Sequence, residues 1–340
     1  MTYNIAIVGS TGAVGREMLQ TLYERDFPVD NVYALASSKS PGRQVSFGDE
    51  RTIDVQPIED FDFSKVDFAF FSAGGDVSEK YAPLAGKNGA LVIDNSSAFR
   101  MTQNVPLIVP EVNHYDLKGC LSENGGMNII ANPNCSTAQL VIILKPLHDL
   151  FNIKRVVIST YQSTSGAGKA PMDELVEQTK LSLENKKIIS KNFTKQIAFN
   201  AIPHIDTFID DGYTKEEIKM ISETKKIISS KIELTATCVR IPVLVSHAES
   251  INIEFEKQFT LEKIREVLEN ASGCKVIDER KDGGYITPVE AEGKNETFIS
   301  RIRKDNSSKN TVNLWCVSDN LLRGAALNAV EIAEAYLKNK

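Results

Sequence analysis

The 340-residue chain is 42% hydrophobic and 25% charged, with a formal net charge of −6. This composition is typical of a folded globular protein and argues against disorder, and the length favours two domains. The acidic balance excludes the basic footprint of a nucleic-acid-binding protein. Because residues 5–9 are too short for a signal or membrane segment, we expect a cytoplasmic protein without a membrane anchor.

The first predicted strand and turn indicate a dinucleotide site. Residues 4–9 form a short apolar run typical of a buried parallel strand, and a helix is predicted over residues 16–22. Between them, Gly9 permits a tight turn, Gly12 permits close approach of a pyrophosphate, and Gly15 permits close packing of the helix. A glycine-rich loop that binds nothing is the alternative. The predicted cofactor contacts are Gly9, Thr11, Gly12, Ala13, Val14 and Gly15.

The end of the second predicted strand, residues 32–36, favours NADP over NAD. Folds that prefer NAD usually place Asp or Glu there to bind the ribose 2′-hydroxyl. This chain instead has Ser37, Lys39 and Ser40, with Arg43 beyond them, so hydroxyls and cations would hold a 2′-phosphate. A solvated surface lysine is the alternative for Lys39.

Three further strands are predicted over residues 67–72, 90–95 and 128–131. A polar loop, residues 73–76, follows the first of them, at the strand edge where this fold class binds ligands. Arg100 follows the second strand and could contact an anion bound there. The alternative for Arg100 is a surface arginine.

Cys135 follows the last of these strands and opens an apolar helix, predicted to end near Pro146 or one turn later. A thiol at a helix N-terminus meets outward-pointing N–H groups and the positive end of the helix dipole, which favour the thiolate. The thiolate is the form that attacks carbonyl carbon. The five cysteines are scattered and form no CxxC pair, so the sequence predicts reduced thiols and no metal site. A buried core cysteine is the alternative for Cys135.

The second half begins with a predicted strand over residues 155–162 and a Gly/Ser loop over residues 163–169. That loop could cradle an anion or a nicotinamide, but it lacks the spacing of a Walker motif. A helix is predicted from Pro171, since proline is favoured in the first turn.

Another helix is predicted from the N-cap Thr214 to about Ser229. Glu216 and Lys219 are three residues apart and share a face of this helix. Their spacing alone favours a solvated charge pair.

The remaining elements surround His247, which is expected in a loop between two strands. A lone histidine is more often structural than catalytic, but this loop position sets His247 apart from His114, His148 and His204. The last helix is expected to pack on the first domain. The elements predicted here are strands over residues 234–243, 250–255 and 312–318, and helices over residues 261–268 and 325–337.

Eight segments together resemble the aspartate-semialdehyde dehydrogenases of bacteria. They span residues 9–15, 95–100, 132–137, 162–168, 198–203, 216–219, 238–243 with His247, and 319–326. The resemblance implies an α/β fold with an NADP-binding Rossmann domain, residues 1–134 plus 321–340. It also implies an α+β catalytic and dimerisation domain, residues 135–320, like that of the glyceraldehyde-3-phosphate dehydrogenases, and a homodimer.

The resemblance also implies roles for individual residues. Cys135 matches the nucleophile, His247 the acid/base group, and Arg240 the arginine that binds the substrate carboxylate through its planar guanidinium. The other matches are Glu216 near the substrate amino group, Arg100 and Lys219 at the phosphate, Gln162 at the acyl group, Asn134 beside the nucleophile, and Ser165, Gly166 and Asn320 at the cofactor.

The implied reaction is the reversible, NADPH-dependent reductive dephosphorylation of L-4-aspartyl phosphate to L-aspartate 4-semialdehyde through a Cys135 thioester. It belongs to the aspartate pathway to lysine, methionine and threonine. One alternative is another acyl-phosphate reductase, such as the N-acetyl-γ-glutamyl-phosphate enzyme, against which Glu216 and the Asn-Cys-Ser-Thr context argue. The other alternative is a non-catalytic NADP-sensing protein.

Overall fold

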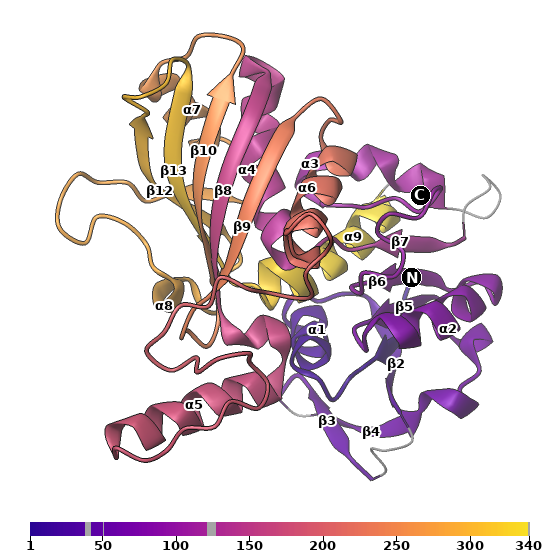
Figure 1. Cartoon of the computed structure of the whole chain (residues 1–340). Helices are drawn as coiled ribbons and strands as arrows, with labels where there is room; N and C mark the ends of the chain where they lie inside the picture. The colour runs from indigo at the N-terminus through magenta and orange to yellow at the C-terminus, as the bar shows by residue number, and fades with distance from the viewer. Residues whose placement is uncertain (38–41, 50, 121–126, 339–340) are drawn as a thin grey trace. The chain divides into compact units, whose positions relative to one another are not determined.

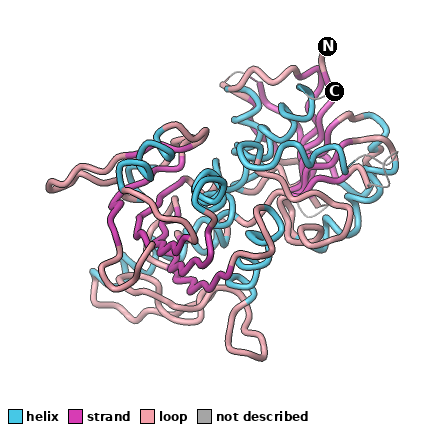
Figure 2. The backbone as a smooth tube through the Cα atoms, turned by 90° about the horizontal axis from the view of Figure 1, so that it is seen from above, coloured by secondary structure: helices cyan, strands magenta, loops and turns pink. Residues whose placement is uncertain are grey.

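The computed structural model describes residues 1–37, 42–49, 51–120 and 127–338, and the chain divides into two compact units. Unit 1 comprises Met1–Asn134 and Ala325–Lys340, and unit 2 comprises Cys135–Gly324. Each unit contains one principal β-sheet, and the strands of both are drawn in magenta in Figure 2. No described helix is both long enough and apolar enough to cross a lipid bilayer.

The sheet of unit 1 is parallel except for its edge strand. In spatial order it runs β3 (Gln44–Phe47), β4 (Arg51–Pro57), β2 (Val29–Ala36), β1 (Tyr3–Val8), β5 (Phe68–Phe71), β6 (Leu91–Asp94) and β7 (Ile129–Ala131). Only the β3–β4 pair is antiparallel. The chain leaves β1 toward β2 on one side and returns to β5 on the other, and this reversal opens a ligand crevice at the carboxyl ends of the strands.

The helices of unit 1 bury apolar faces against this sheet. They are α1 (Ala13–Glu24), α2 (Gly75–Lys87), α3 (Pro110–Asn113) and α9 (Leu327–Lys338), with short 3-10 turns at Ile58–Asp60, Phe63–Lys65 and His114–Cys120. Ile5, Ile7 and Phe70 of the strands pack with Val330 and Ile332 of α9, and all five side chains are fully buried. The final helix therefore belongs to the core of unit 1, where the sequence placed it.

The sheet of unit 2 is mixed, and helices cover one of its faces (Figure 1). In spatial order its strands are β11 (Cys274–Val276), β12 (Thr297–Lys304), β13 (Thr311–Ser318), β10 (His247–Phe255), β8 (Ile153–Gln162) and β9 (Glu233–Arg240). The covering helices are α4 (Cys135–Phe151), α6 (Lys215–Ile227) and α7 (Leu261–Glu269). The unit also contains α5 (Lys169–Leu183), α8 (Pro288–Ala291), a 3-10 turn at Thr164–Ala167 and a π-helical turn at Leu322–Ala326.

Alternation along the strands decides which side chains face the helices. Ile158 of β8, Ala236 of β9 and Ile251 of β10 are buried in one cluster with Leu140 and Ile143 of α4. Because side chains alternate between faces with a period of two, Gln162, Arg240 and His247 face the same helices.

The helix from Cys135 passes through Pro146 and ends at Phe151, about one turn later, as predicted. The carbonyl oxygen of Ile142, which Pro146 cannot bond, accepts the Sγ–H of Cys274 at 3.9 Å. Other predictions need correction. The predicted loop at 73–76 is wrong in its second half, since α2 begins at Gly75. Strands β3, β4, β11 and β12 were not predicted, because they are short or carry charged residues on an exposed face.

Candidate active site

Cys135 is the first residue of α4 and is partly exposed. Three other cysteines are buried, and burial raises the pKa of Cys120 to about 11 and the pKa values of Cys238 and Cys316 further still, so they remain thiols. Cys274 is partly exposed but lies on the short strand β11, away from any helix N-terminus. Cys135 is therefore the cysteine whose position favours a reactive thiolate.

Gly324 packs directly against Cys135, and the sequence analysis did not identify it. A β-carbon added at Gly324 would lie 2.6 Å from Cys135 Cβ and 3.0 Å from its Cα, both too close for a carbon contact. The chain therefore needs glycine at this position in order to accommodate Cys135.

We expect Gly324→Ala to lower kcat/KM about 10²-fold, because the added methyl group must displace Cys135 and misplacement by about 1 Å can cost that much. Steady-state kinetics would measure the loss, with thermal unfolding as a check on folding. Gly75→Ala is a matched control, since a β-carbon there meets no described atom within 4 Å. Unchanged kinetics in Gly324→Ala would show that the position of Cys135 does not depend on glycine at position 324.

Strand register brings three predicted site residues to one end of the sheet in unit 2. Gln162 ends β8 and pairs directly with Arg240, which ends the parallel strand β9. His247 begins the antiparallel strand β10, and the next residue, Ala248, pairs with Tyr161 of β8. The three side chains therefore lie together on the helix-covered face, at one end of the sheet. At this end Arg240 interacts electrostatically with Cys135, the first residue of α4.

His247 is fully buried at the start of a strand, so its predicted placement in a loop is wrong. His247 is the first residue of β10, and the strand continues through the buried residues Ala248, Ile251 and Ile253. The backbone N–H of Ser163 donates to Nδ1 at 3.0 Å. Burial, together with the positive charge of Arg240 and against the opposing effect of Glu216, lowers the pKa of His247 to about 3, so the ring is neutral near pH 7.

Glu216 and Lys219 form a partly buried pair instead of the solvated pair that their spacing favoured. Glu216 is only 6% exposed, because the α6 face that carries it packs on β9 and α4. Its carboxylate accepts from Gln162 Nε2 at 3.1 Å and from Lys219 Nζ at 3.2 Å. Burial disfavours the Lys219 ammonium, but Glu216 and Asp206, the latter 2.7 Å away, outweigh it and raise the pKa of Lys219.

The Arg240 guanidinium is buried, with 7% of the residue exposed, and its Nη1 donates to the carbonyl oxygen of Ser163 at 2.5 Å. Burial lowers the pKa of Arg240, whereas the negative charges of Glu216 and Cys135 raise it. A β-carbon at Gly166 would lie 3.2 Å from His247 Nε2 and 3.6 Å from Arg240 Nη1. Gly166 therefore leaves room beside both side chains for a small polar ligand.

Arg100 and Asn134 belong to unit 1, and both are buried. The alternative of a surface arginine is therefore wrong for Arg100, which is 8% exposed. Its Nε donates to the carbonyl oxygen of Asn132 at 2.9 Å, and its Nη2 donates to that of Asn95 at 2.8 Å. These bonds fix the guanidinium at the end of β6.

The glycine turn of unit 1 fits the phosphates of a dinucleotide. Gly9 has φ +88°, and a β-carbon at Gly15 would lie 2.3 Å from the carbonyl oxygen of Gly9, so both positions require glycine. Gly12 caps α1, and across this fully described helix there is no side-chain cap and no acidic residue in the first turn. Its N-terminal N–H groups can therefore bind an anion.

The other predicted cofactor residues are distributed over both units. Thr11, Ala13 and Val14 are half-buried in the glycine turn, and Ser37 is exposed after β2. Lys39 and Ser40 lie outside the described residues. Ser165 and Asn320 bond each other in unit 2, with Asn320 Nδ2 donating to Ser165 Oγ at 2.9 Å. In the part of the chain that the structure describes, no group of three or more His, Cys, Asp or Glu residues is placed to hold a metal ion.

A doubly wound sheet with a glycine turn after its first strand, followed in the same chain by a second, mixed sheet, is the architecture of two-domain dehydrogenases that bind a dinucleotide. Two family models match: "Semialdehyde dehydrogenase, NAD binding domain" over residues 4–120 and "Semialdehyde dehydrogenase, dimerisation domain" over residues 144–323.

Curated relatives and solved structures narrow this class. An aspartate-semialdehyde dehydrogenase of Rickettsia bellii is 49% identical over 99% of this chain and 98% of its own. One from Aquifex aeolicus is 50% identical over 99% of both chains. The crystal structure of aspartate semialdehyde dehydrogenase II from Vibrio cholerae, complexed with ASA, superposes with a TM-score of 0.95 at 45% identity, over 99% of both chains.

The chain belongs to the aspartate-semialdehyde dehydrogenase family. This confirms the predicted family, the predicted fold and the assignment as an oxidoreductase of amino-acid biosynthesis. The comparisons support neither the N-acetyl-γ-glutamyl-phosphate reductase nor the NADP-sensing protein.

Proposed function

We propose that this chain catalyses the reversible reductive dephosphorylation of L-4-aspartyl phosphate to L-aspartate 4-semialdehyde with NADPH. The observation that carries the proposal is the meeting of Gln162, Arg240 and His247 at one sheet end, where Arg240 interacts electrostatically with Cys135. A nucleophile, a carboxylate-binding cation and an oxygen-binding imidazole are the groups that this reaction requires.

In the proposed mechanism, the Cys135 thiolate attacks the acyl carbon of the substrate and expels phosphate, which leaves a thioester on Sγ. NADPH, when bound, supplies the hydride for this thioester. We assign the acid/base role at the substrate oxygen to His247, and Gln162 orients the acyl group. The C–S bond then breaks, the aldehyde leaves, and Cys135 returns to the thiolate. Dividing the reaction at a covalent thioester replaces one difficult step by two easier ones.

The charges of unit 2 complement an amino acid. Buried Arg240 can pair with the α-carboxylate, since a guanidinium binds a carboxylate through two parallel hydrogen bonds. Glu216, already held by Gln162 and Lys219, can accept from the α-ammonium group. We assign the phosphate to Lys219 and Arg100 and a supporting place beside the nucleophile to Asn134.

For the cofactor, we propose NADP, with its pyrophosphate at Gly9, Thr11, Gly12, Ala13, Val14 and Gly15. Ser37, Lys39 and Ser40 would hold the 2′-phosphate, and Ser165, Gly166 and Asn320 would contact the cofactor in unit 2. The capless N-terminus of α1 and the absence of an acidic residue in its described first turn support this assignment.

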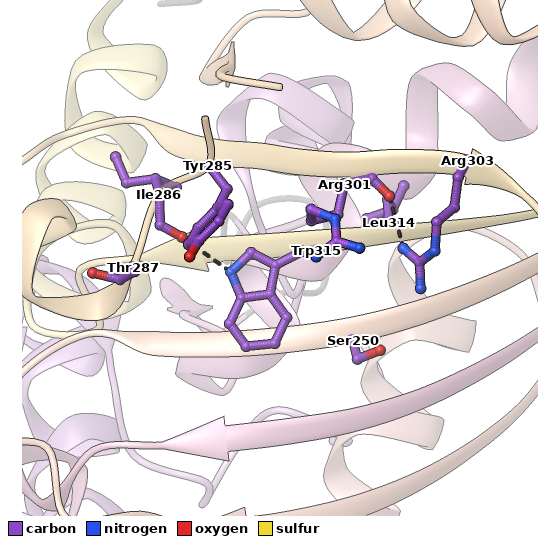
Figure 3. A pocket seen from close by; sticks show the side chains of 8 residues that line it. All are labelled: Ser250, Tyr285, Ile286, Thr287, Arg301, Arg303, Leu314 and Trp315. Atoms are coloured by element: carbon purple, nitrogen blue, oxygen red, sulfur yellow. Dashed lines mark hydrogen bonds between the residues drawn. The ribbon is translucent and has the colours of Figure 1, made fainter. Parts of the chain in front are cut away.

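We further propose a homodimer formed through the sheet face of unit 2 opposite α4. Trp315, Arg301, Arg303 and Ser250 line a hollow of about 270 Å³ on this face, and Figure 3 shows their side chains. Trp315 is held there by a bond from its Nε1 to the carbonyl oxygen of Ile286 at 3.1 Å. Aromatic and arginine side chains are enriched in protein interfaces, and the matched family model is described as a dimerisation domain. Five free cysteines support a reducing compartment, and we propose the cytoplasm.

The test of the proposed reaction is phosphate-dependent formation of NADPH from L-aspartate 4-semialdehyde and NADP. N-acetyl-L-glutamate 5-semialdehyde is the matched control substrate, because it lacks the free ammonium group that Glu216 would bind. We expect kcat/KM for the aspartate compound to exceed that for the control compound by about 10²-fold or more. The reason is that the control compound cannot give the buried Glu216 an ammonium partner. Equal or reversed preference would contradict the proposed substrate.

A further inference from the structure

Glu249 is a buried carboxyl group that the proposed mechanism does not use. It lies two residues after His247 on β10, so alternation places both side chains on the helix-covered face of the sheet. Glu249 is fully buried, and neither of its carboxyl oxygens has a hydrogen-bond partner in the part of the chain that the structure describes. An unpaired buried polar atom is costly, because it loses its hydrogen bonds to water without replacement. The burial of Glu249 therefore needs a physical reason.

Strand register places Glu249 one row, or two residues along each strand, below the site. It pairs with Cys316 of β13 on one side and with Thr160 of β8 on the other. Thr160 Oγ1 donates to Gln162 Oε1 at 2.9 Å, so this row supports a residue of the site. One row further from the site, Ile251 already belongs to the apolar core. Glu249 therefore lies between the site and the core of unit 2.

Gln139 approaches Glu249 from α4. It follows Cys135 by one helical turn, so the two side chains lie on the same face of the helix. Gln139 is 1% exposed, and neither its Nε2 nor its Oε1 has a hydrogen-bond partner among the described residues. Its amide is nevertheless close enough to Glu249 to affect the pKa of the carboxyl group. The next residue on this helix face, Ile143, is buried in one cluster with Ile251.

The helix and the strand advance by nearly equal steps along this contact. Four residues of an α-helix rise about 6 Å, and two residues of an antiparallel strand rise about 6.8 Å. Because α4 packs on β10, Gln139 and Ile143 of the helix match Glu249 and Ile251 of the strand. A bond between Gln139 and Glu249 would therefore fix the height of Cys135 along the sheet.

We propose that Glu249 is a positioning residue for Cys135. As a neutral carboxylic acid, it forms two reciprocal hydrogen bonds with the side-chain amide of Gln139, and this pair fixes the start of α4 on β10. The inference rests on the proposed function, in which Cys135 is the nucleophile. The carboxyl O–H donates to Gln139 Oε1, and Gln139 Nε2 donates to the carbonyl oxygen of Glu249. The terminal torsions of both side chains have broad minima, so the pair can close without movement of the backbone.

The surroundings of Glu249 favour the neutral acid. Burial raises its pKa well above the usual range, against a smaller opposing effect of Gln139. The titratable and charged groups on the elements around it are Cys316 on β13, His247 on β10, Cys238 and Arg240 on β9, and Cys135 at the start of α4. Burial keeps the imidazole and the two strand thiols neutral. The strand that carries Arg240 is separated from β10 by β8, and its guanidinium is bound by the Ser163 carbonyl oxygen.

The neutral state is tested by ¹³C NMR of the full-length protein labelled at the glutamate Cδ atoms, with Glu249→Gln used to assign the signal. An ordinary glutamate is ionised near pH 7, since its pKa is about 4.3. We expect the Glu249 signal at this pH to have the chemical shift of an un-ionised carboxyl group. Glu254 of the same strand, which pairs with Lys154, is the internal reference. A carboxylate shift for Glu249 near pH 7 would overturn the inference.

Variants test whether the pair positions Cys135. In Glu249→Gln two amides can form the same reciprocal bonds, so we expect kcat within about threefold of the wild type. Glu249→Met keeps the length of the side chain but loses both bonds, and kcat should fall about 10-fold or more, with KM for NADP and for phosphate within about twofold. Gln139→Met should cause the same loss. The double Met variant should lose no more than either single variant, because the two side chains act as one unit.

Thr297→Val is the matched control, since it removes a fully buried hydroxyl that has no hydrogen-bond partner among the described residues. Thr297 lies on β12, which β13 separates from β10, so this variant should keep wild-type kinetics. Unchanged kcat in Glu249→Met, or an equal loss in Glu249→Gln, would contradict the positioning role. Because the NMR readout needs no turnover, an inactive wild-type protein with a neutral Glu249 would contradict the proposed reaction and not the pairing.

Discussion

Cys135→Ala is expected to lower kcat by about 10⁴-fold or more, because no other group at the start of α4 can form the thioester. Binding of NADPH should remain within about twofold, since the glycine turn that would hold its phosphates lies in the other unit. Steady-state kinetics and fluorescence titration with NADPH would measure the two effects.

Cys274→Ala is the matched control, since Cys274 is the other partly exposed thiol and lies on the edge strand β11. We expect it to keep wild-type kinetics. Appreciable aldehyde oxidation by Cys135→Ala would show that another residue is the nucleophile.

The second large effect is expected at Arg240. Arg240→Lys keeps the positive charge but loses the planar fork and the bond from Nη1 to the Ser163 carbonyl oxygen. We expect kcat/KM for the semialdehyde to fall about 10²–10³-fold, which is the effect of losing one buried, hydrogen-bonded charge pair. Most of the loss should appear in KM, because the α-carboxylate is bound in the ground state and in the transition state alike.

Arg265→Lys is a suitable control, since Arg265 lies on α7, away from the end of β9, and pairs with Asp278. Its kinetics should match the wild type. A kcat/KM within about threefold of the wild type in Arg240→Lys would argue against a carboxylate bound through two parallel hydrogen bonds.

Much of the fold could be predicted from local pattern. The runs at β1, β5 and β6 are apolar because both faces of a parallel sheet are buried, and this pattern can be read without knowledge of neighbours. Thr214 could be predicted as an N-cap because capping is a local property, and the structure adds a capping box with Glu217 within the same four residues. Strands β3 and β12 gave no such signal, since their charged and polar residues become strand only through pairing with β4 and β13.

The site was less accessible to pattern alone. The spacing of Glu216 and Lys219 is equally compatible with a solvated pair, and only the packing of α6 on β9 buries Glu216 and makes the pair partly buried. His247 looked like a loop residue because the strand it begins takes its register from β8 and β13. Gly324 could not be identified, because its requirement for glycine comes from Cys135, 189 positions away in sequence (324 − 135).

The central claim is that Cys135 carries the acyl group of the substrate as a thioester. It is tested most directly by mass spectrometry of the enzyme mixed with L-aspartate 4-semialdehyde and NADP in phosphate-free buffer, where the thioester should accumulate. We predict a mass gain of one β-aspartyl group on the peptide containing Cys135, and its loss when phosphate is added. An unmodified Cys135 peptide during NADPH formation, or the same adduct on a different residue, would contradict the claim.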